Sequence, residues 1–141
     1  MFSSNYTNRL YGRTRGRSKK NINLNNYHEA VDRYKFQNFN EKSEYILDVG
    51  TGYGETSIFL AKKFPEKVVI SCEKYIDGNI ILLKNIQKNN INNILLHNGN
   101  VYNIIEITNK KYFNLVWVFF PDPWPKNRHA KRRLITSEYL I

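Results

Sequence analysis

The chain has 141 residues, a length typical of one domain, and 41% of them are hydrophobic, enough to form a core. Its 22 Lys and Arg against 12 Asp and Glu give a formal charge of +10, which favours a polyanionic partner such as nucleic acid. The single cysteine excludes a disulfide within the chain. Because the sequence contains no apolar run long enough for a membrane span or a secretory signal, we expect a cytoplasmic protein without a membrane partner.

The beginning of the chain differs in composition from the rest. Residues 1–27 contain no Asp or Glu but many Arg and Lys, and Gly12 and Gly16 disfavour a stable helix there. We expect residues 1–27 to form a flexible basic arm that binds phosphates, followed by one domain at residues 28–141. The alternative is an organelle transit peptide.

Strand-like and helix-like segments alternate from Tyr45 onward. Short apolar runs predict four strands, at residues 45–49, 68–72, 94–97 and 115–120. Helical spacing predicts helices from about Glu55 to just before Pro65, at residues 76–89 and at residues 101–107. This order predicts an α/β fold with a Rossmann-like open parallel sheet, in which ligands bind beyond the carboxyl ends of the strands.

A glycine-rich loop follows the first predicted strand. The sequence there is Asp48-Val49-Gly50-Thr51-Gly52-Tyr53-Gly54. Glycine lets the backbone approach a ligand, and Glu73, at the end of the second predicted strand, can accept both ribose hydroxyls of a nucleoside. An acid ahead of G-x-G-x-G suits the cationic S-adenosylmethionine better than the pyrophosphate of NAD. The alternative is a tight turn beside a solvated strand end.

A rigid, basic stretch follows the fourth predicted strand. It reads Phe119-Phe120-Pro121-Asp122-Pro123-Trp124-Pro125-Lys126-Asn127-Arg128-His129-Ala130-Lys131-Arg132-Arg133. Prolines fix the loop that holds Asp122, Trp124 offers a face for base stacking, and the cations after it suit phosphates. This combination predicts an enzyme acting on an RNA base, whereas a proline-rich turn before an ordinary basic helix is the alternative.

The same stretch resembles the signature F-F-P-D-P-W-x-K-x-R-H-x-K-R-R of bacterial tRNA (guanine-N7-)-methyltransferases. The similarity extends from about Leu10 to the last residue and includes the glycine loop and Glu73. The resemblance implies a class I methyltransferase fold, S-adenosylmethionine as cofactor, and methylation of N7 of a guanosine in the variable loop of tRNA.

The resemblance also implies a role for individual residues. The cofactor contacts would be Asp48, Gly50, Gly52, Gly54, Glu73, Asn100 and Asp122, with Asn100 standing where the family usually has Asp near the adenine. The RNA contacts would be Trp124, Lys126, Arg128, His129, Lys131, Arg132 and Arg133. Asp122 would be the catalytic residue. Guanine N7 carries a lone pair and needs no general base, so we expect Asp122 to orient the base and favour its developing positive charge.

The family continues beyond the position of Ile141 with a fifth strand and a further hairpin, so the resemblance implies a C-terminally truncated chain. The fourth predicted strand would then be an apolar edge. Three interpretations stay open: an inactive shortened product, a fragment of a longer chain, or a protein completed by self-association or a partner chain. The alternative functions are an inactive RNA-binding remnant and, third, a nicotinamide-dependent oxidoreductase. The three histidines lack ligand spacing, so we expect no metal site.

Overall fold

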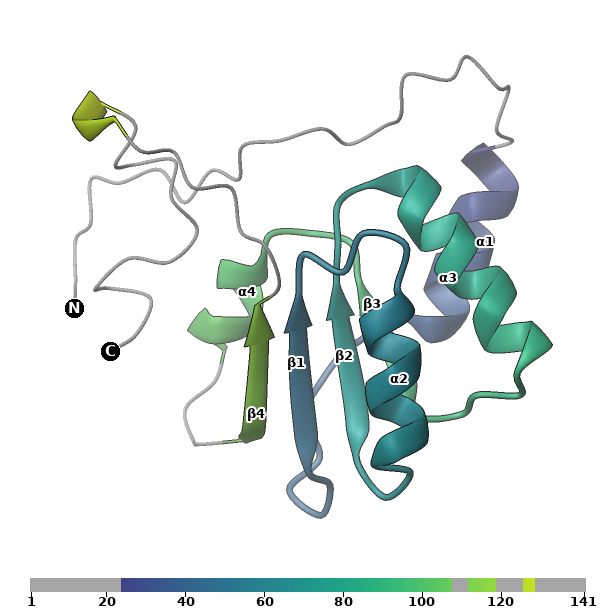
Figure 1. Cartoon of the computed structure of the whole chain (residues 1–141), viewed down its shortest axis with the longest axis horizontal. Coiled ribbons are helices and arrows are strands. Elements are labelled where there is room, and N and C mark those ends of the chain that lie inside the picture. Colours follow the sequence, from purple (N-terminus) through teal and green to yellow (C-terminus); the bar gives the residue numbers. More distant parts are fainter. Residues whose placement is uncertain (1–23, 108–111, 119–125, 129–141) are drawn as a thin grey trace.

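The computed structural model describes residues 24–107, 112–118 and 126–128 (Figure 1). Four strands form one sheet: β1 (Tyr45–Val49), β2 (Val68–Cys72), β3 (Ile94–His97) and β4 (Phe113–Val118). They are all parallel, in the order β3-β2-β1-β4. The predicted α/β fold with an open parallel sheet is therefore confirmed, and β1, β2 and β3 have the predicted bounds.

Among the strands, only β4 differs from its predicted bounds, while helices α3 (Ile76–Lys88) and α4 (Val101–Glu106) each end one residue earlier than predicted. β4 begins at Phe113 rather than Leu115, because Phe113 pairs with Tyr45 and packs edge-on against Phe39 with ring centroids 5.5 Å apart. The pairing shifts register between Tyr45 and Ile46, an irregularity that an apolar run cannot reveal. The predicted last residues, Phe119 and Phe120, lie outside the described residues.

Four helices accompany the strands: α1 (Leu24–Tyr34), α2 (Glu55–Lys63), α3 (Ile76–Lys88) and α4 (Val101–Glu106). Alternate strand residues face opposite sides of the sheet. Ile46 and Val69 pack with α1, α2 and α3 in one buried cluster, whereas Leu47 and Ile70 pack with α4 in another. The helices therefore cover both faces, with α4 on the side opposite α1–α3 (Figure 1).

The first helix begins before the predicted domain boundary. α1 starts at Leu24, and its Tyr27 and Val31, one turn apart, are buried against the sheet. Residues 1–23 of the expected basic arm lie outside the described residues. After α1 the chain runs beside β3, where Phe36 N donates to Leu96 O at 2.8 Å.

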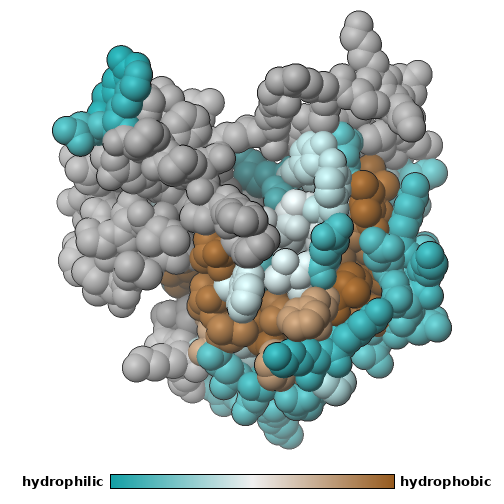
Figure 2. Space-filling model, in the orientation of Figure 1, coloured by the Kyte–Doolittle hydropathy of each residue, from teal (hydrophilic) through white to brown (hydrophobic). Residues whose placement is uncertain are grey.

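Among the described strands, β3 forms one edge of the sheet and β4 forms the other. In the described ranges, β4 pairs with β1 alone, and its Val116 and Trp117 are 45% and 38% exposed. Figure 2 shows hydrophobic atoms at the surface in the region where Figure 1 places β1 and β4. Covering of this edge by a second copy or another chain stays a prediction.

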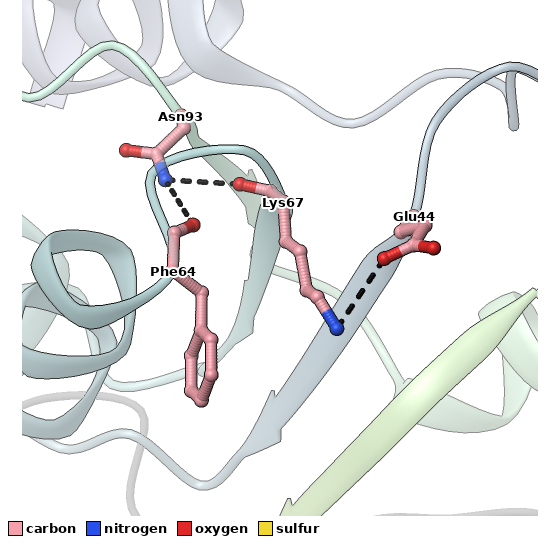
Figure 3. A network of polar contacts seen from close by, with 4 residues as sticks. All are labelled: Glu44, Phe64, Lys67 and Asn93. Atoms are coloured by element: carbon pink, nitrogen blue, oxygen red, sulfur yellow. Dashed lines mark hydrogen bonds and ion pairs between the residues drawn. The ribbon is translucent and has the colours of Figure 1, made fainter.

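The loops at the amino ends of the strands are fixed by one side chain. Asn93 Nδ2 donates to the carbonyl oxygens of Ala61, Phe64 and Lys67 at 3.0, 3.3 and 2.9 Å. Lys67 Nζ also lies 3.3 Å from Glu44 Oε2 (Figure 3). These contacts tie α2 and the start of β2 to the start of β3, at the end of the sheet opposite the glycine loop.

None of the helices in the described part of the chain is both long and apolar enough to span a membrane.

Candidate functional site

The glycine loop lies at the carboxyl ends of β1 and β2. Gly50, Gly52 and Gly54 all have positive φ, at +71°, +57° and +81°, so each adopts a conformation that other residues rarely tolerate. Gly50 N donates to Cys72 O at 2.9 Å, which holds the start of the loop against the end of β2. A Cβ on Gly54 would lie 2.5 Å from Leu82 Cδ1, so close packing on α3 also requires glycine there.

Glu73 connects the glycine loop to the turn before α3. Its Oε2 accepts a hydrogen bond from Gly52 N at 2.8 Å, and its Oε1 accepts one from Tyr75 N at 2.9 Å. The structure therefore brings Glu73 and the glycine loop together. Each carboxylate oxygen has two lone pairs, so acceptor capacity is left on both oxygens for hydroxyl groups of a ligand.

Asp48 lies in the interior at the base of this loop. Its side chain is fully buried, Ser57 Oγ donates to Oδ2 at 2.7 Å, and Oδ1 has no partner among the described residues. Burial raises the pKa of Asp48 to about 6, with a smaller raising effect from Glu73, against the lowering effect of the Ser57 hydrogen bond. A buried carboxylate oxygen without a partner favours a cation or a hydrogen-bond donor nearby.

Three residues that support this site were not among the predicted ones. Ser57 and the buried Leu60 and Ala61 share one face of α2, a spacing that could have revealed Ser57. Gly78 stands in the first turn of α3, where a Cβ would lie 2.0 Å from Gly52 O. A glycine inside a predicted helix is the signal for such a close approach. The third is Asn79, a buried amide on the apolar face of α3.

Two tyrosines stand beside the glycine loop and the β2–α3 turn. The rings of Tyr53 and Tyr75 have centroids 6.0 Å apart at an angle of 54°, and Tyr53 is 50% exposed. The hydrogen bond between them is the main reason that the pKa of Tyr75 is raised. The pair gives this edge of the site an aromatic surface of the kind on which a flat base can stack.

Asn100 follows β3 and caps α4. Its Oδ1 accepts a hydrogen bond from Tyr102 N at 3.0 Å, and its main-chain oxygen lies 2.8 Å from His97 Nε2. Glu73 N donates to His97 O at 3.1 Å, so the ends of β2 and β3 meet beside this loop. The structure therefore gives Asn100 a helix-capping role at the edge of the sheet where an adenine contact was predicted.

The predicted substrate residues follow β4. Val118, the last residue of β4, pairs with Val49, so the chain leaves β4 at the carboxyl ends of the strands, where the glycine loop also lies. Lys126 and Arg128 are described and exposed. Outside the described residues lie Asp122, Trp124, His129, Lys131, Arg132 and Arg133. Within the described ranges, no group of three or more His, Cys, Asp or Glu side chains could hold a metal ion.

Comparison with known proteins assigns the family. The family model Methyltransf_4, described as "Putative methyltransferase", matches residues 42–141. The chain belongs to this family of methyltransferases. The predicted relationship to tRNA guanine-N7 methyltransferases is confirmed as homology.

Two relatives illustrate how much of this methyltransferase family the chain covers. It is 37% identical over 138 residues to the "tRNA (guanine-N(7)-)-methyltransferase" of Neorickettsia sennetsu, covering 94% of this chain and 60% of that protein. It is 33% identical to the "Bifunctional methyltransferase" of Rickettsia conorii, covering 99% of this chain and 27% of that protein. The chain thus spans 60% or less of the length of these relatives.

Solved structures of other methyltransferases are similar to this chain over part of its length. An rRNA methylase from Streptococcus thermophilus matches with a TM-score of 0.47 and 13% identity, over 77% of this chain and 59% of that one. The M. capricolum TrmK in complex with S-adenosyl-homocysteine matches with a TM-score of 0.45 and 20% identity, over 67% of this chain and 40% of that one.

Proposed function

We propose that the protein transfers a methyl group from S-adenosylmethionine to N7 of a guanosine in the variable loop of tRNA. The observation that carries the cofactor part is the buried Asp48 carboxylate, whose Oδ1 has no partner among the described residues. It lies at the base of a glycine loop that is hydrogen-bonded to Glu73. The tRNA part is supported by homology to proteins named tRNA (guanine-N(7)-)-methyltransferase. With tRNA as substrate, we infer a cytoplasmic location.

The residues present fit S-adenosylmethionine. Its ammonium and sulfonium groups are cationic, and Asp48 supplies a negative charge with an oxygen atom that lacks a partner among the described residues. Glu73 retains acceptor capacity for the ribose hydroxyls, and the Tyr53–Tyr75 pair offers an aromatic surface beside them. When bound, S-adenosylmethionine supplies an electrophilic methyl group on a good leaving group.

The substrate side of the proposal relies on the segment after β4. Lys126 and Arg128 are exposed cations that suit tRNA phosphates. We assign further RNA contacts to Trp124, His129, Lys131, Arg132 and Arg133. We assign Asp122 the role of orienting the guanine and stabilising the positive charge that the base gains, because N7 attacks through its own lone pair. We assign Asn100 to the adenine side of the site, where its side chain also caps α4.

Binding of S-adenosylhomocysteine, measured by isothermal titration calorimetry, tests the cofactor site. We expect Asp48→Asn to weaken binding about tenfold or more, because it removes the negative charge that offsets the ligand ammonium. Glu73→Gln should also weaken it, through the loss of a charged acceptor. Glu66→Gln, an exposed carboxylate on the turn before β2, is the matched control and should leave affinity unchanged. Folded protein that binds no S-adenosylhomocysteine would refute the proposed cofactor.

Methyl transfer from labelled S-adenosylmethionine to unmodified tRNA tests the reaction. We expect N7-methylguanosine in the product with the unaltered chain and none with Asp122→Ala. Salt-sensitive tRNA binding without methyl transfer would instead indicate the alternative function, an inactive RNA-binding protein.

A further inference from the structure

A chain of hydrogen bonds connects α1 to the glycine loop through the end of β2. Asn79 Nδ2 donates to Tyr27 OH at 3.2 Å and to Glu73 O at 2.9 Å. The carboxylate of Glu73 then accepts from Gly52 N at 2.8 Å. Three elements distant in sequence are thus linked by consecutive polar contacts that end at the candidate site.

The position of Asn79 makes this link more than packing. Asn79 is 1% exposed and Tyr27 is 5% exposed, so the contact between them is out of water. On α3, Asn79 shares its buried face with Leu82, Leu83 and Ile86, where an apolar side chain would pack without the loss of hydration. Its Oδ1 has no partner among the described residues, so the amide is retained at a free-energy cost. The amide contributes two hydrogen bonds from its nitrogen, which hold Tyr27 OH and Glu73 O in place.

The contacts around Glu73 explain how such a link reaches the site. Tyr75 N donates to Glu73 Oε1 at 2.9 Å, and Asn79 N donates to Tyr75 O at 3.1 Å. The side-chain amide of Asn79 therefore holds the main-chain oxygen of Glu73, and Tyr75 N holds its Oε1. With the main chain and one carboxylate oxygen held, Oε2 faces Gly52 N in a fixed geometry.

We propose that Tyr27 and Asn79 are positioning residues that fix the main chain of Glu73, and through it the contact between its carboxylate and the glycine loop. As a consequence, α1 affects the affinity of the site formed by the glycine loop and Glu73 for its ligand, although no residue of α1 belongs to the glycine loop or to the β2–α3 turn. The effect on affinity rests on the proposed function, whereas the effect on the loop does not.

Removal of a single hydroxyl group tests the proposal. In Tyr27→Phe the ring stays, and Asn79 Nδ2 loses one of its two acceptors while the other, Glu73 O, remains. The matched control is Tyr45→Phe, since Tyr45 is 3% exposed and its OH accepts one hydrogen bond, from Asn40 N at 2.7 Å, at the opposite end of β1. Asn79→Ala removes both hydrogen bonds of the Asn79 amide. If Asn79→Ala fails to fold, Tyr27→Phe still tests the proposal.

The first measurement is amide hydrogen exchange at Gly52 in the ligand-free chain. We expect exchange to be about fivefold faster in Tyr27→Phe, the effect of weakening one hydrogen-bonded contact, and unchanged in Tyr45→Phe. Equal exchange in Tyr27→Phe and the unaltered chain would overturn the proposal. So would equal acceleration in the control, because the effect would then be one of general stability.

The second measurement is the dissociation constant of S-adenosylhomocysteine. We expect it to rise about fivefold in Tyr27→Phe and to stay within about twofold in Tyr45→Phe. Faster exchange at Gly52 together with no ligand binding by the unaltered chain would support the positioning role and refute the proposed function. Unchanged exchange at Gly52 together with ligand binding by the unaltered chain would overturn the positioning role and support the cofactor part of the proposed function.

Discussion

The neighbouring strands β1 and β4 differ sharply in burial although both read as apolar runs. All five residues of β1 are buried, whereas in β4 three residues are exposed and three are of intermediate burial. β1 pairs with β2 on one side and β4 on the other, while β4, over its described neighbours, pairs with β1 alone. The comparison teaches that the apolarity of a run does not by itself decide how deeply the strand is buried. Neighbouring strands and packed helices decide it together, since β3 pairs with β2 alone but buries Ile94 and Leu96 in the cluster with α1, α2 and α3.

The candidate site divides along the same line. The residues after β1 and β2 are held by one another: Glu73 contacts Gly52, Ser57 contacts Asp48, and Gly50 contacts Cys72. The predicted RNA-binding residues all follow β4, the strand with one described neighbour. Substitutions in the region after β1 and β2 should therefore lower the unfolding free energy strongly, and substitutions in β4 only slightly.

The largest effect is expected for Gly78→Ala. Alanine in a helix normally stabilises it by about 1 kcal/mol relative to glycine, but here the Cβ would lie 2.0 Å from Gly52 O, and main chain must move. We expect a net loss of about 3 kcal/mol in unfolding free energy, measured by urea denaturation. Gly99→Ala is the control, because its Cβ would meet side chains alone, the His97 ring at 3.2 Å and Asn103 Nδ2 at 3.9 Å. Equal losses in the two variants would contradict the close approach of α3 to the loop.

The second prediction concerns pH and Asp48. Its pKa is about 6 in the folded protein against an ordinary value of 3.8, so the folded state binds a proton more tightly than the unfolded chain. Unfolding free energy should therefore fall as pH rises from about 4 to 6, by on the order of 2–3 kcal/mol, and Asp48→Asn should remove this contribution. Affinity for S-adenosylhomocysteine should change in the opposite direction, since the carboxylate that favours its ammonium forms as pH rises. Parallel pH dependence of stability and affinity would contradict this assignment.

A pair of identical substitutions tests the comparison of the strands directly. Val49→Thr places a hydroxyl group in the buried end of β1 and should cost about 2 kcal/mol of unfolding free energy. Val116→Thr makes the same change in β4 at a side chain that is 45% exposed, and should cost about 0.5 kcal/mol or less. Thermal or urea unfolding of both variants measures the difference. A cost at Val116 equal to that at Val49 would show that β4 is covered in solution.

The last prediction concerns the amino ends of the strands, opposite the glycine loop. Asn93→Ala removes donors to three main-chain oxygens (two of them drawn in Figure 3) and should lower the unfolding free energy by about 1–2 kcal/mol. Asn92→Ala, at an exposed neighbouring position, is the control. Because Asn93 lies away from the glycine loop, ligand affinity should be unchanged in both variants, and a change in affinity would contradict the separation of the two ends.

Local sequence signals predicted most of the fold and the main chain of the site. β1, β2 and β3 are short apolar runs bounded by turn residues, and three glycines mark the loop where positive φ is needed. The supporting contacts could not be predicted in the same way. Tyr27 and Asn79 are 52 positions apart, and nothing local in either residue indicates the other. The early start of β4 likewise depends on pairing with Tyr45 across the sheet.

The central place of β1 also bears on how the chain folds during synthesis. Residues 45–97 contain three adjacent strands and the two helices between them, together with the glycine loop and Glu73. On the ribosome, this unit emerges before Phe113 and can form its strand pairs while β4 is still being made. β4 then adds to an edge of β1 that is already in place, so the unit that carries the glycine loop provides the template on which β4 pairs.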